Sequence, residues 1–553
     1  MMRAEVPPVP VPSPAAWAGL GAWNLYFLLK FLLLWQGLLN LHVLPNLLFA
    51  GVLLLPLQRT WLRRLRQWLA LPAGVALFYY DSWLSSLDRL PELALLLEFT
   101  PEYLLELAGR LLNWNLIGLL VLLLVAYRLL APWVRLSSVS LVGLLWLGLQ
   151  SLPGFQGLPP AANAKVMASA PSAGIEGRAA NAKVASADAG PVDSRTLNDY
   201  LQQFYREEAT RQTRFAPAAA QAAPFDLLLL NICSLAWDDL QDAGLSEHPL
   251  LRQMDVVFDN FNSASAYSGP SVIRLLRASC GQSSHAGLYQ PPGEQCLLFE
   301  NLKALGFSGE MALNHNGRFD GFLQEVQAEG RMPAPTPLTA RLRHKLVGFD
   351  GSPIWRDREV LGGWWQHRQA LDSPRVALFY NSISLHDGNR LVLDDGRTQR
   401  ADYRSRAQML LDDLSAFIGE LQRSGRRVVL VLVPEHGAAL HGDHMQIAGM
   451  REIPSPAITH VPVGIKLIGM SAQPRSEPLH VSEPSSYLAL SELVARLHEG
   501  RANTPEGLDW TALLGGLPQT PRVAENSGTV VLDYQGTTYV RIKEQGEWLP
   551  YPN

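Results

Sequence analysis

The sequence predicts a two-part protein: an α-helical membrane bundle of about five spans, then an α/β domain around a mostly parallel central sheet. Two observations support this fold class. Charged side chains make up 17 of the first 153 residues, against 79 of the remaining 400. Beyond residue 194, apolar runs of strand length alternate with helical patterns, as in sheets covered by helices on both faces.

The predicted bundle rests on five apolar stretches close to the roughly 20 residues that a bilayer-crossing helix needs. They are 17–38, 42–57, 67–80, 111–130 and 136–152. The second and third are short, and one re-entrant pair is the alternative for these two. Arginines gather between the second and third stretches, and acidic residues between the third and fourth. The positive-inside rule then places the N-terminus in the cytoplasm and the C-terminal domain outside.

Composition divides the chain into three predicted parts. Residues 1–153 form the membrane domain, 154–193 a flexible Ala/Ser/Gly/Pro-rich linker, and 194–553 the α/β domain. The region beyond residue 153 has 36 basic against 43 acidic residues. Nucleic-acid binding is therefore not expected, because it needs a basic surface.

The α/β domain is read from apolar runs and helical periodicity. The expected strands are 225–232, 375–383, 427–433 and 461–468, and the expected helices are 270–278, 358–371, 401–423 and 485–498. Residues 528–543 alternate around Gln535-Gly536 and predict a terminal hairpin.

Metal-ligand side chains follow three of the expected strands. Cys233 comes after the first, His386 after the second, and the pair Glu435 and His436 after the third. Ligands of such sheets bind outside the carboxyl ends of the strands. The sequence therefore predicts that these residues face one site.

The three cysteines divide into a pair and a single residue. Cys280 and Cys296 are 16 residues apart, and we expect a disulfide between them if the domain lies in an oxidising compartment. Cys233 is then left alone. It is either a buried core cysteine or a zinc ligand, and the nearby Glu-His pair favours zinc.

Ser268 stands before a helical run and is the candidate nucleophile. One interpretation is an ordinary N-cap serine, with Pro270 in the first turn. The other is a nucleophile at a helix N-terminus, where free backbone N–H groups hold phosphate. Tyr267 and Arg451 are candidate phosphate contacts, since arginine forks onto phosphate oxygens.

These motifs resemble the phosphoethanolamine transferases of the alkaline phosphatase superfamily. Most of that family carries Glu at the first strand end, a Thr nucleophile and an Asp-His pair, where this chain has Cys233, Ser268 and Glu435-His436. The residues of this chain at these positions are similar to those of the members that modify cellulose. The segments 265–271, 434–440 and 451–456 also resemble motifs of those members. The resemblance extends over nearly the whole chain.

The resemblance implies a site and a reaction. Zinc would be held by Cys233, Ser268, Glu435 and His436, with His386 beside it as general acid or as an orienting group. An alkaline-phosphatase-like periplasmic domain, on a multi-pass protein of the bacterial inner membrane, would pass phosphoethanolamine from phosphatidylethanolamine to a cellulose 6-hydroxyl. The intermediate would be a phosphoethanolamine ester of Ser268, and the partners would be cellulose synthase subunits.

Other functions fit the same residues. A sulfatase-like hydrolase would use water as acceptor, and a phosphoglycerol transferase or a lipid A or other glycan transferase would differ in donor or acceptor. A membrane scaffold of a polysaccharide synthase would need no chemistry. Trp364 and Trp365 are expected to pack in the core, His441 and His444 to lie in a surface loop, and Lys30 either to snorkel or to pair within the bundle.

Overall fold

The computed structural model divides the chain into two compact units. The smaller contains Met1–Ala94 and Leu107–Ser186, and the larger Leu95–Glu106 and Ala187–Asn553. The structure describes residues 19–35, 39–57, 59–82, 98–111, 114–150, 192–219, 222–470, 477–500, 502–504, 507–543 and 546–551. The division into three parts that was expected from composition stays a prediction.

The smaller unit is helical. Its helices are α1 (Trp23–Trp35), α2 (Val43–Leu54), α3 (Thr60–Asp81), α5 (Trp114–Leu130) and α6 (Leu136–Gln150). Lys30 of α1 is fully buried and donates to Asp81 at 2.7 Å and to Asn46 at 2.9 Å. Of the two expected arrangements of Lys30, pairing within the bundle is therefore present, and it ties α1, α2 and α3 together.

The predicted set of five spans is wrong. No helix within the described ranges has both the length and the apolar character needed to cross a bilayer. Four of the helices have 12 to 17 residues. The longer α3 includes Arg63, Arg64 and Arg66, whereas the sequence analysis placed these residues in a loop. Arginine is a good helix former, so the helix can continue through them. Parts of the predicted spans, such as 17–18, 36–38 and 151–152, fall outside the described residues.

The larger unit contains the expected mostly parallel sheet. Its seven strands, in spatial order, are β11 (Leu479–Val481), β2 (Val256–Phe258), β10 (Val463–Ile468), β9 (Val428–Pro434), β1 (Asp226–Ile232), β6 (Val376–Ser382) and β3 (Ser308–Leu313). Only β10 among these seven runs against its neighbours. The carboxyl ends of β3, β6, β1 and β9 therefore meet at one edge.

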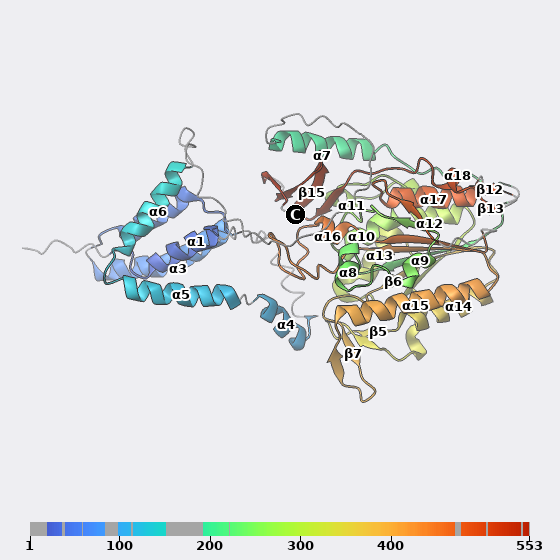
Figure 1. Ribbon diagram of the computed structural model, residues 1–553, viewed down its shortest axis with the longest axis horizontal. Helices are drawn as coiled ribbons and strands as arrows, with labels where there is room; N and C mark the ends of the chain where they lie inside the picture. Colours follow the sequence, from blue (N-terminus) through green and yellow to red (C-terminus); the bar gives the residue numbers. More distant parts are fainter. Residues whose placement is uncertain are drawn as a thin grey trace, which may run out of the picture. The chain divides into compact units, whose positions relative to one another are not determined.

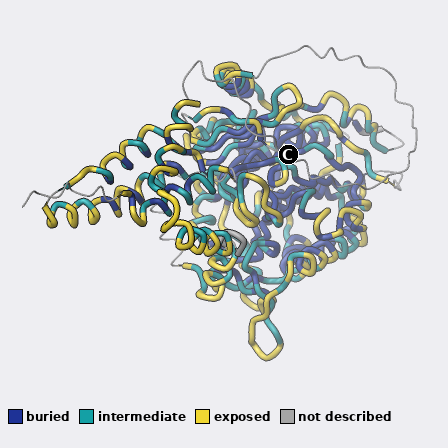
Figure 2. Tube along the Cα trace, turned by 60° about the vertical axis from the view of Figure 1, so that its left-hand side comes forward, coloured by how far each residue is buried: buried dark blue, intermediate teal, exposed yellow. Residues whose placement is uncertain are grey.

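Helices cover both faces of this sheet (Figure 1). One face packs on α10 (Ser268–Leu276), α12 (Leu298–Ala304), α13 (Phe322–Gly330), α17 (Tyr487–Glu499) and α18 (Trp510–Leu514). The other packs on α8 (Trp237–Asp242), α9 (Pro249–Gln253), α14 (Asp357–Ala370) and α15 (Tyr403–Arg423). Leu227 and Leu229 of β1 join the first core and Leu228 and Leu230 the second, as strand alternation requires. Figure 2 shows the buried stretches gathered in the middle of this unit.

A second, antiparallel sheet ends the chain. It consists of β14 (Val523–Asn526), β15 (Thr529–Tyr534), β16 (Thr537–Ile542) and β17 (Trp548–Pro550). The expected hairpin is β15–β16, and Gln535 and Gly536 turn it with φ of 51° and 80°. Helix α7 (Ser194–Glu208) packs on this sheet through Leu197, Leu201 and Phe204.

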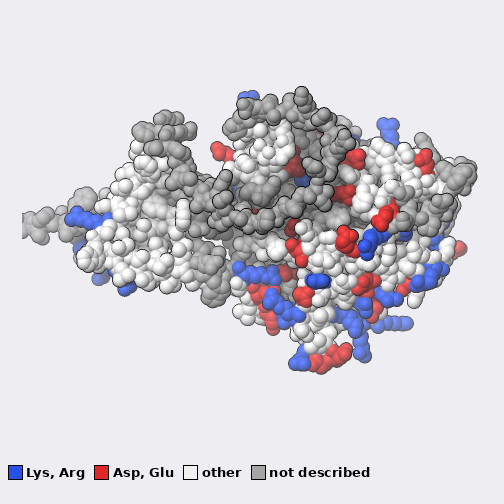
Figure 3. Space-filling model, in the orientation of Figure 1, with Lys and Arg blue, Asp and Glu red and all other residues white. Residues whose placement is uncertain are grey.

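The remaining elements are short. They are α11 (His285–Leu288), α16 (Pro456–Thr459), β4 (Leu346–Val347), β5 (Pro353–Ile354), β7 (Arg390–Val392), β8 (Thr398–Arg400), β12 (Asn503–Thr504), β13 (Gly507–Leu508) and the 3-10 turns Glu294–Cys296, Phe319–Gly321 and Thr339–Arg341. On the face shown in Figure 3, basic and acidic side chains are interspersed over the larger unit.

Residues 98–106 belong to the larger unit although residues of the smaller unit flank them in the sequence. They include the first turns of α4 (Pro101–Leu111). Thr100 N–H donates to the Phe349 carbonyl at 2.9 Å, and the rings of Phe99 and Tyr103 pack against the ring of Phe349. We call residues 98–106 the docking segment.

Candidate functional site

The site lies at the carboxyl ends of two neighbouring parallel strands. Ile232 of β1 pairs with Pro434 of β9 in register. The next residues along each strand are Cys233 and Glu435, so the register places these two side chains side by side. Ser234 turns the chain immediately after Cys233 with a φ of +62°, a conformation that is uncommon outside glycine and typical of functional turns.

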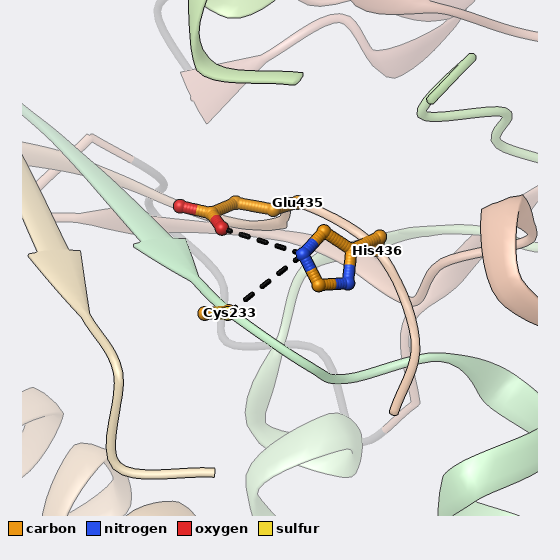
Figure 4. A group of neighbouring side chains, drawn as sticks. All are labelled: Cys233, Glu435 and His436. Carbon is orange, nitrogen blue, oxygen red and sulfur yellow. Dashed lines mark hydrogen bonds and ion pairs between the residues drawn. The ribbon is translucent and has the colours of Figure 1, made fainter. Parts of the chain in front are cut away.

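Cys233, Glu435 and His436 form a compact buried group (Figure 4). Their potential ligand atoms lie within 4.8 Å of one another. His436 Nε2 is 3.8 Å from Cys233 Sγ and 3.8 Å from Glu435 Oε2. All three side chains are fully buried.

Ser268 completes the group from a different element. Its Oγ is 3.3 Å from His436 Nε2 and 3.5 Å from Cys233 Sγ, and the residue is partly exposed. Ser268 is the first residue of α10, whereas Tyr267 occupies the N-cap position. The expected N-cap assignment is therefore one residue off. No side chain caps this helix, which leaves the N–H groups of its first turn for an oxyanion.

The electrostatics of the group fit a cation. Burial, reinforced by the Glu435 carboxylate, raises the pKa of the Cys233 thiol to about 12. Burial also raises the pKa of Glu435 and, together with Arg451, lowers that of His436. Each shift disfavours the charged form of a side chain in an apolar setting. A divalent cation would reverse this for the thiol and carboxylate, because it compensates both negative charges.

The side chains of this group present ligand atoms that are suited to zinc. Within the described part of the chain, Glu435 Oε2 is a buried oxygen with no hydrogen-bond partner. His436 Nδ1 lies 2.8 Å from the Gly437 carbonyl and 3.0 Å from Arg451 Nη1. With Nδ1–H donating to the carbonyl, the Nε2 lone pair faces Cys233, Ser268 and Glu435. A thiolate, an imidazole nitrogen, a carboxylate oxygen and a hydroxyl are ligand types that suit tetrahedral zinc.

Arg451 and Tyr267 border the group, as the sequence predicted for phosphate contacts. Arg451 Nη1 lies 3.0 Å from His436 Nδ1 and 3.2 Å from His436 Nε2, and the guanidinium is 5.6 Å from the Tyr267 ring centre. Tyr267 Oη donates to Glu452 at 2.8 Å. Their substrate-binding role stays a prediction.

Asn526 was missed by the sequence analysis. From the end of β14 it accepts from Ala266 N–H at 3.1 Å and donates to the carbonyls of Arg451 and Glu452 at 2.8 and 3.1 Å. It therefore holds the segment before Ser268 against the segment that carries Arg451. Asn526 lies some 260 residues from its partner Ala266, and no local pattern marks it.

His386 lies in the loop after β6. Its Nδ1 is 2.9 Å from the Asp387 carbonyl, and its ring stacks on Phe349 with 4.3 Å between ring centres. Desolvation, with the nearby Arg451 charge second, lowers the pKa of His386 to about 4. The ring is therefore neutral at pH 7. The structure describes no hydrogen bond from His386 to Ser268, Cys233, Glu435 or His436.

The docking segment supports the His386 loop from outside. Tyr103 Oη donates to Asp387 Oδ2 at 3.1 Å, and the Tyr103 ring lies against Gly388 so closely that a Cβ there would meet ring carbon at 2.6 Å. Glu106 pairs with Arg400. This contact between residues far apart in sequence fixes the loop that carries His386.

The expected disulfide is present, between Cys280 and Cys296. Cys280 follows the end of α10, so the bond anchors the helix that carries Ser268. Trp364 and Trp365 are buried in the core as expected. His441 and His444 are exposed, and His441 contacts Asp242 at 2.9 Å.

Known proteins match the chain along nearly its full length. The C-terminal domain of cellulose biosynthesis protein BcsG matches residues 181–548, and the N-terminal domain of the same protein matches residues 23–149. The chain belongs to the BcsG family. This confirms the resemblance to the cellulose-related members of the family that the motifs at Cys233, Ser268 and Glu435 indicated.

Two relatives within this family have a high identity. Cellulose biosynthesis protein BcsG of Escherichia coli strain K12 is 46% identical over 97% of each chain. Its counterpart in Salmonella typhimurium strain LT2 is 44% identical over 100% of this chain and 99% of its own length.

Solved structures are more distant. The integral membrane lipooligosaccharide phosphoethanolamine transferase A of Neisseria meningitidis is 13% identical, with a TM-score of 0.40, over 86% of this chain and 95% of its own.

Proposed function

We propose that the protein transfers phosphoethanolamine from phosphatidylethanolamine to the 6-hydroxyl of a cellulose glucosyl unit, through an ester on Ser268. The observation that supports this most strongly is the placement of Ser268 Oγ. It stands at the uncapped N-terminus of α10, partly exposed, within 3.5 Å of both a thiol sulfur and an imidazole nitrogen. A hydroxyl so placed is a typical activated nucleophile.

Zinc is the cation that we propose for the site, held by Cys233, Ser268, Glu435 and His436. When bound, it lowers the pKa of a hydroxyl ligand and draws electron density from phosphoryl oxygens. The backbone N–H groups of α10 and the Arg451 guanidinium hold the phosphoryl oxygens.

Two displacements follow at phosphorus. In the first, the Ser268 Oγ–P bond forms, the bond from phosphorus to the diacylglycerol oxygen breaks, and the proton lost by Ser268 ends on that oxygen. In the second, the sugar 6-hydroxyl oxygen bonds to phosphorus and loses its proton, the Oγ–P bond breaks, and that proton ends on Ser268 Oγ. We assign His386 either the proton transfer or the orientation of the phosphoryl group: with Nδ1–H bound to the Asp387 carbonyl, its Nε2 carries the lone pair that takes part in proton transfer.

The disulfide supports an oxidising compartment for the larger unit, such as the periplasm. Membership of a cellulose biosynthesis family supports cellulose as acceptor and cellulose synthase subunits as partners. The resemblance of the motifs to phosphoethanolamine transferases supports the donor.

The test measures the product. The full chain is incubated with phosphatidylethanolamine and cello-oligosaccharides, and the sugars are analysed by mass spectrometry and phosphorus NMR. The protein should add phosphoethanolamine to the sugar, and Ser268→Ala should abolish the addition. Ser271→Ala, about one turn further along the same helix and fully buried, is the matched control and should retain activity. Cleavage of the donor with no modified sugar would refute the transferase and indicate a hydrolase.

A further inference from the structure

A row of hydrogen-bonded polar side chains lies behind the cation group, across four neighbouring strands. Asn231 of β1 and Asn381 of β6 are direct partners in register, and Leu313, the last residue of β3, also pairs with Asn381. His315 follows β3, and Glu435 follows β9. Asn231, Asn381 and Glu435 are fully buried and His315 is nearly so.

The hydrogen bonds in this row have one consistent direction. Gly317 N–H donates to His315 Nδ1 at 3.1 Å, so Nε2 carries the imidazole proton and donates to Asn381 Oδ1 at 2.8 Å. Burial lowers the pKa of His315 to about 4, which keeps this ring neutral with a single N–H. The amide oxygen of Asn381 therefore faces His315, and its NH₂ faces the other way.

The NH₂ group of Asn381 has two acceptors. It donates to Glu435 Oε1 and, at 2.9 Å, to Asn231 Oδ1. The orientation of Asn231 is set in turn, because its own NH₂ donates to the Val433 carbonyl at 2.9 Å. Each amide in the row is thus fixed from both ends.

The two oxygens of the Glu435 carboxylate consequently differ. Oε1 is occupied by Asn381, whereas Oε2 lacks a partner in the described part of the chain and lies 3.8 Å from His436 Nε2. An amide donor on one oxygen disfavours chelation through both. Hydrogen bonds to ligating carboxylates commonly set metal affinity in this way.

We propose that Asn381 is a positioning residue that makes Glu435 a one-oxygen ligand through Oε2, with His315 fixing the direction of the Asn381 amide. This inference rests on the cation site of the proposed function. It explains the geometry of that site, because the hydrogen-bonded row determines which oxygen of Glu435 binds the cation and how that oxygen is oriented.

The experiment measures cation binding by the full chain rather than activity. Zinc affinity is determined by competition with a chromophoric chelator, and the cobalt(II)-loaded protein is examined by its visible d–d absorption. Asn381→Leu keeps the side-chain size but removes the donor to Glu435. We expect zinc affinity to fall 10- to 100-fold and the d–d bands to weaken, since a carboxylate that binds through both oxygens raises the coordination number above four.

Asn314→Leu is the matched control. Asn314 is fully buried at the end of β3 and donates to Ser382, Ser384 and Asp357, but not to Glu435. Its replacement should leave zinc affinity and the cobalt spectrum unchanged. In case Asn381→Leu does not fold, His315→Phe keeps the donor to Glu435 and removes the bond that orients it, together with the acceptor of Gly317 N–H. We expect a smaller loss of affinity for that variant, with the same direction of spectral change.

A double-mutant cycle separates positioning from a general effect on the fold. If Asn381 acts through Glu435, Asn381→Leu should weaken zinc binding no further in the background of Glu435→Ala. Additive losses, or unchanged affinity and spectrum in the single variants, would overturn the inference while leaving the proposed function intact. Failure of the unmodified chain to bind zinc or cobalt would instead refute the cation site itself, and this inference with it.

Discussion

Replacing Asp226 by leucine should cost the larger unit about 5 kcal/mol of unfolding free energy, near the upper end for breaking a buried ion pair. Asp226 opens β1, the strand that ends next to Cys233. Its Oδ1 accepts from Arg368 Nε and Nη2 at 3.1 and 2.8 Å, and Arg368 is fully buried. Without the carboxylate, the acceptors that remain for this guanidinium among the described residues are the carbonyls of Leu371 and Ser373.

The opposite replacement should cost less. Arg368→Met leaves Asp226 with Arg426 Nε at 3.1 Å and Val376 N–H at 2.9 Å, so we expect about 3 kcal/mol. The double variant, Asp226→Leu with Arg368→Met, should cost only about 2 kcal/mol, because no charge is then stranded and mainly the Val376 N–H lacks an acceptor.

The assay is urea unfolding of the full chain followed by near-ultraviolet circular dichroism, with the free energy extrapolated to water. Arg358→Met, which removes a half-exposed partner of Glu420, is the control and should not move the midpoint. Equal costs for the two single variants, or a double variant as unstable as their sum, would refute the reasoning that a stranded buried charge dominates.

Three further outcomes are expected. Replacing Cys280 and Cys296 by serine should cost about 3 kcal/mol of stability for a loop of this length, measured as a shift of the urea midpoint without reductant; no shift would show that the bond does not constrain the unfolded chain. Tyr103→Phe should lower kcat about threefold to tenfold, the effect of one hydrogen bond, at unchanged KM; a change in KM alone would contradict support of the His386 loop. Because the folded pKa of His315 is about 4 against an ordinary 6.5, the unfolded chain binds its proton first, so stability should fall as pH drops from 6.5 toward 4. His315→Phe should flatten that slope, and an unchanged slope would contradict the assignment.

The sequence predicted well those features that depend on local patterns, namely the buried strands and the residues that follow them. Apolar runs followed by Cys233, His386 and Glu435 predicted one edge of a parallel sheet, and the register of β1 with β9 does bring Cys233 beside Glu435. The disulfide was predicted from spacing and compartment. These inferences needed only the rule that parallel strands deliver their carboxyl ends to one edge.

The helices of the smaller unit were predicted less well. Apolar composition marked five stretches, but composition does not say where a helix stops. Helix α1 has 13 residues, and α3 extends back through the arginine-rich segment. Capping and packing decide such ends, and neither is visible in a hydropathy pattern.

The supporting residues of the site were missed for a different reason. Asn381 stands inside an apolar run, so it looks like an exception in a strand until the neighbouring strands are known. Asn526 comes from a separate sheet and acts across some 260 residues. Contacts of this kind depend on tertiary packing, and no local pattern within a single sequence reveals them.

The measurement that tests the central claim most directly is peptide mass spectrometry of the full chain after incubation with phosphatidylethanolamine alone. With no sugar acceptor present, the account predicts a phosphoethanolamine ester on the peptide that contains Ser268, absent from Ser268→Ala and present in Ser271→Ala. The adduct should disappear when cello-oligosaccharides are added. An unmodified Ser268 peptide, together with an uncleaved donor in zinc-loaded protein, would contradict the account.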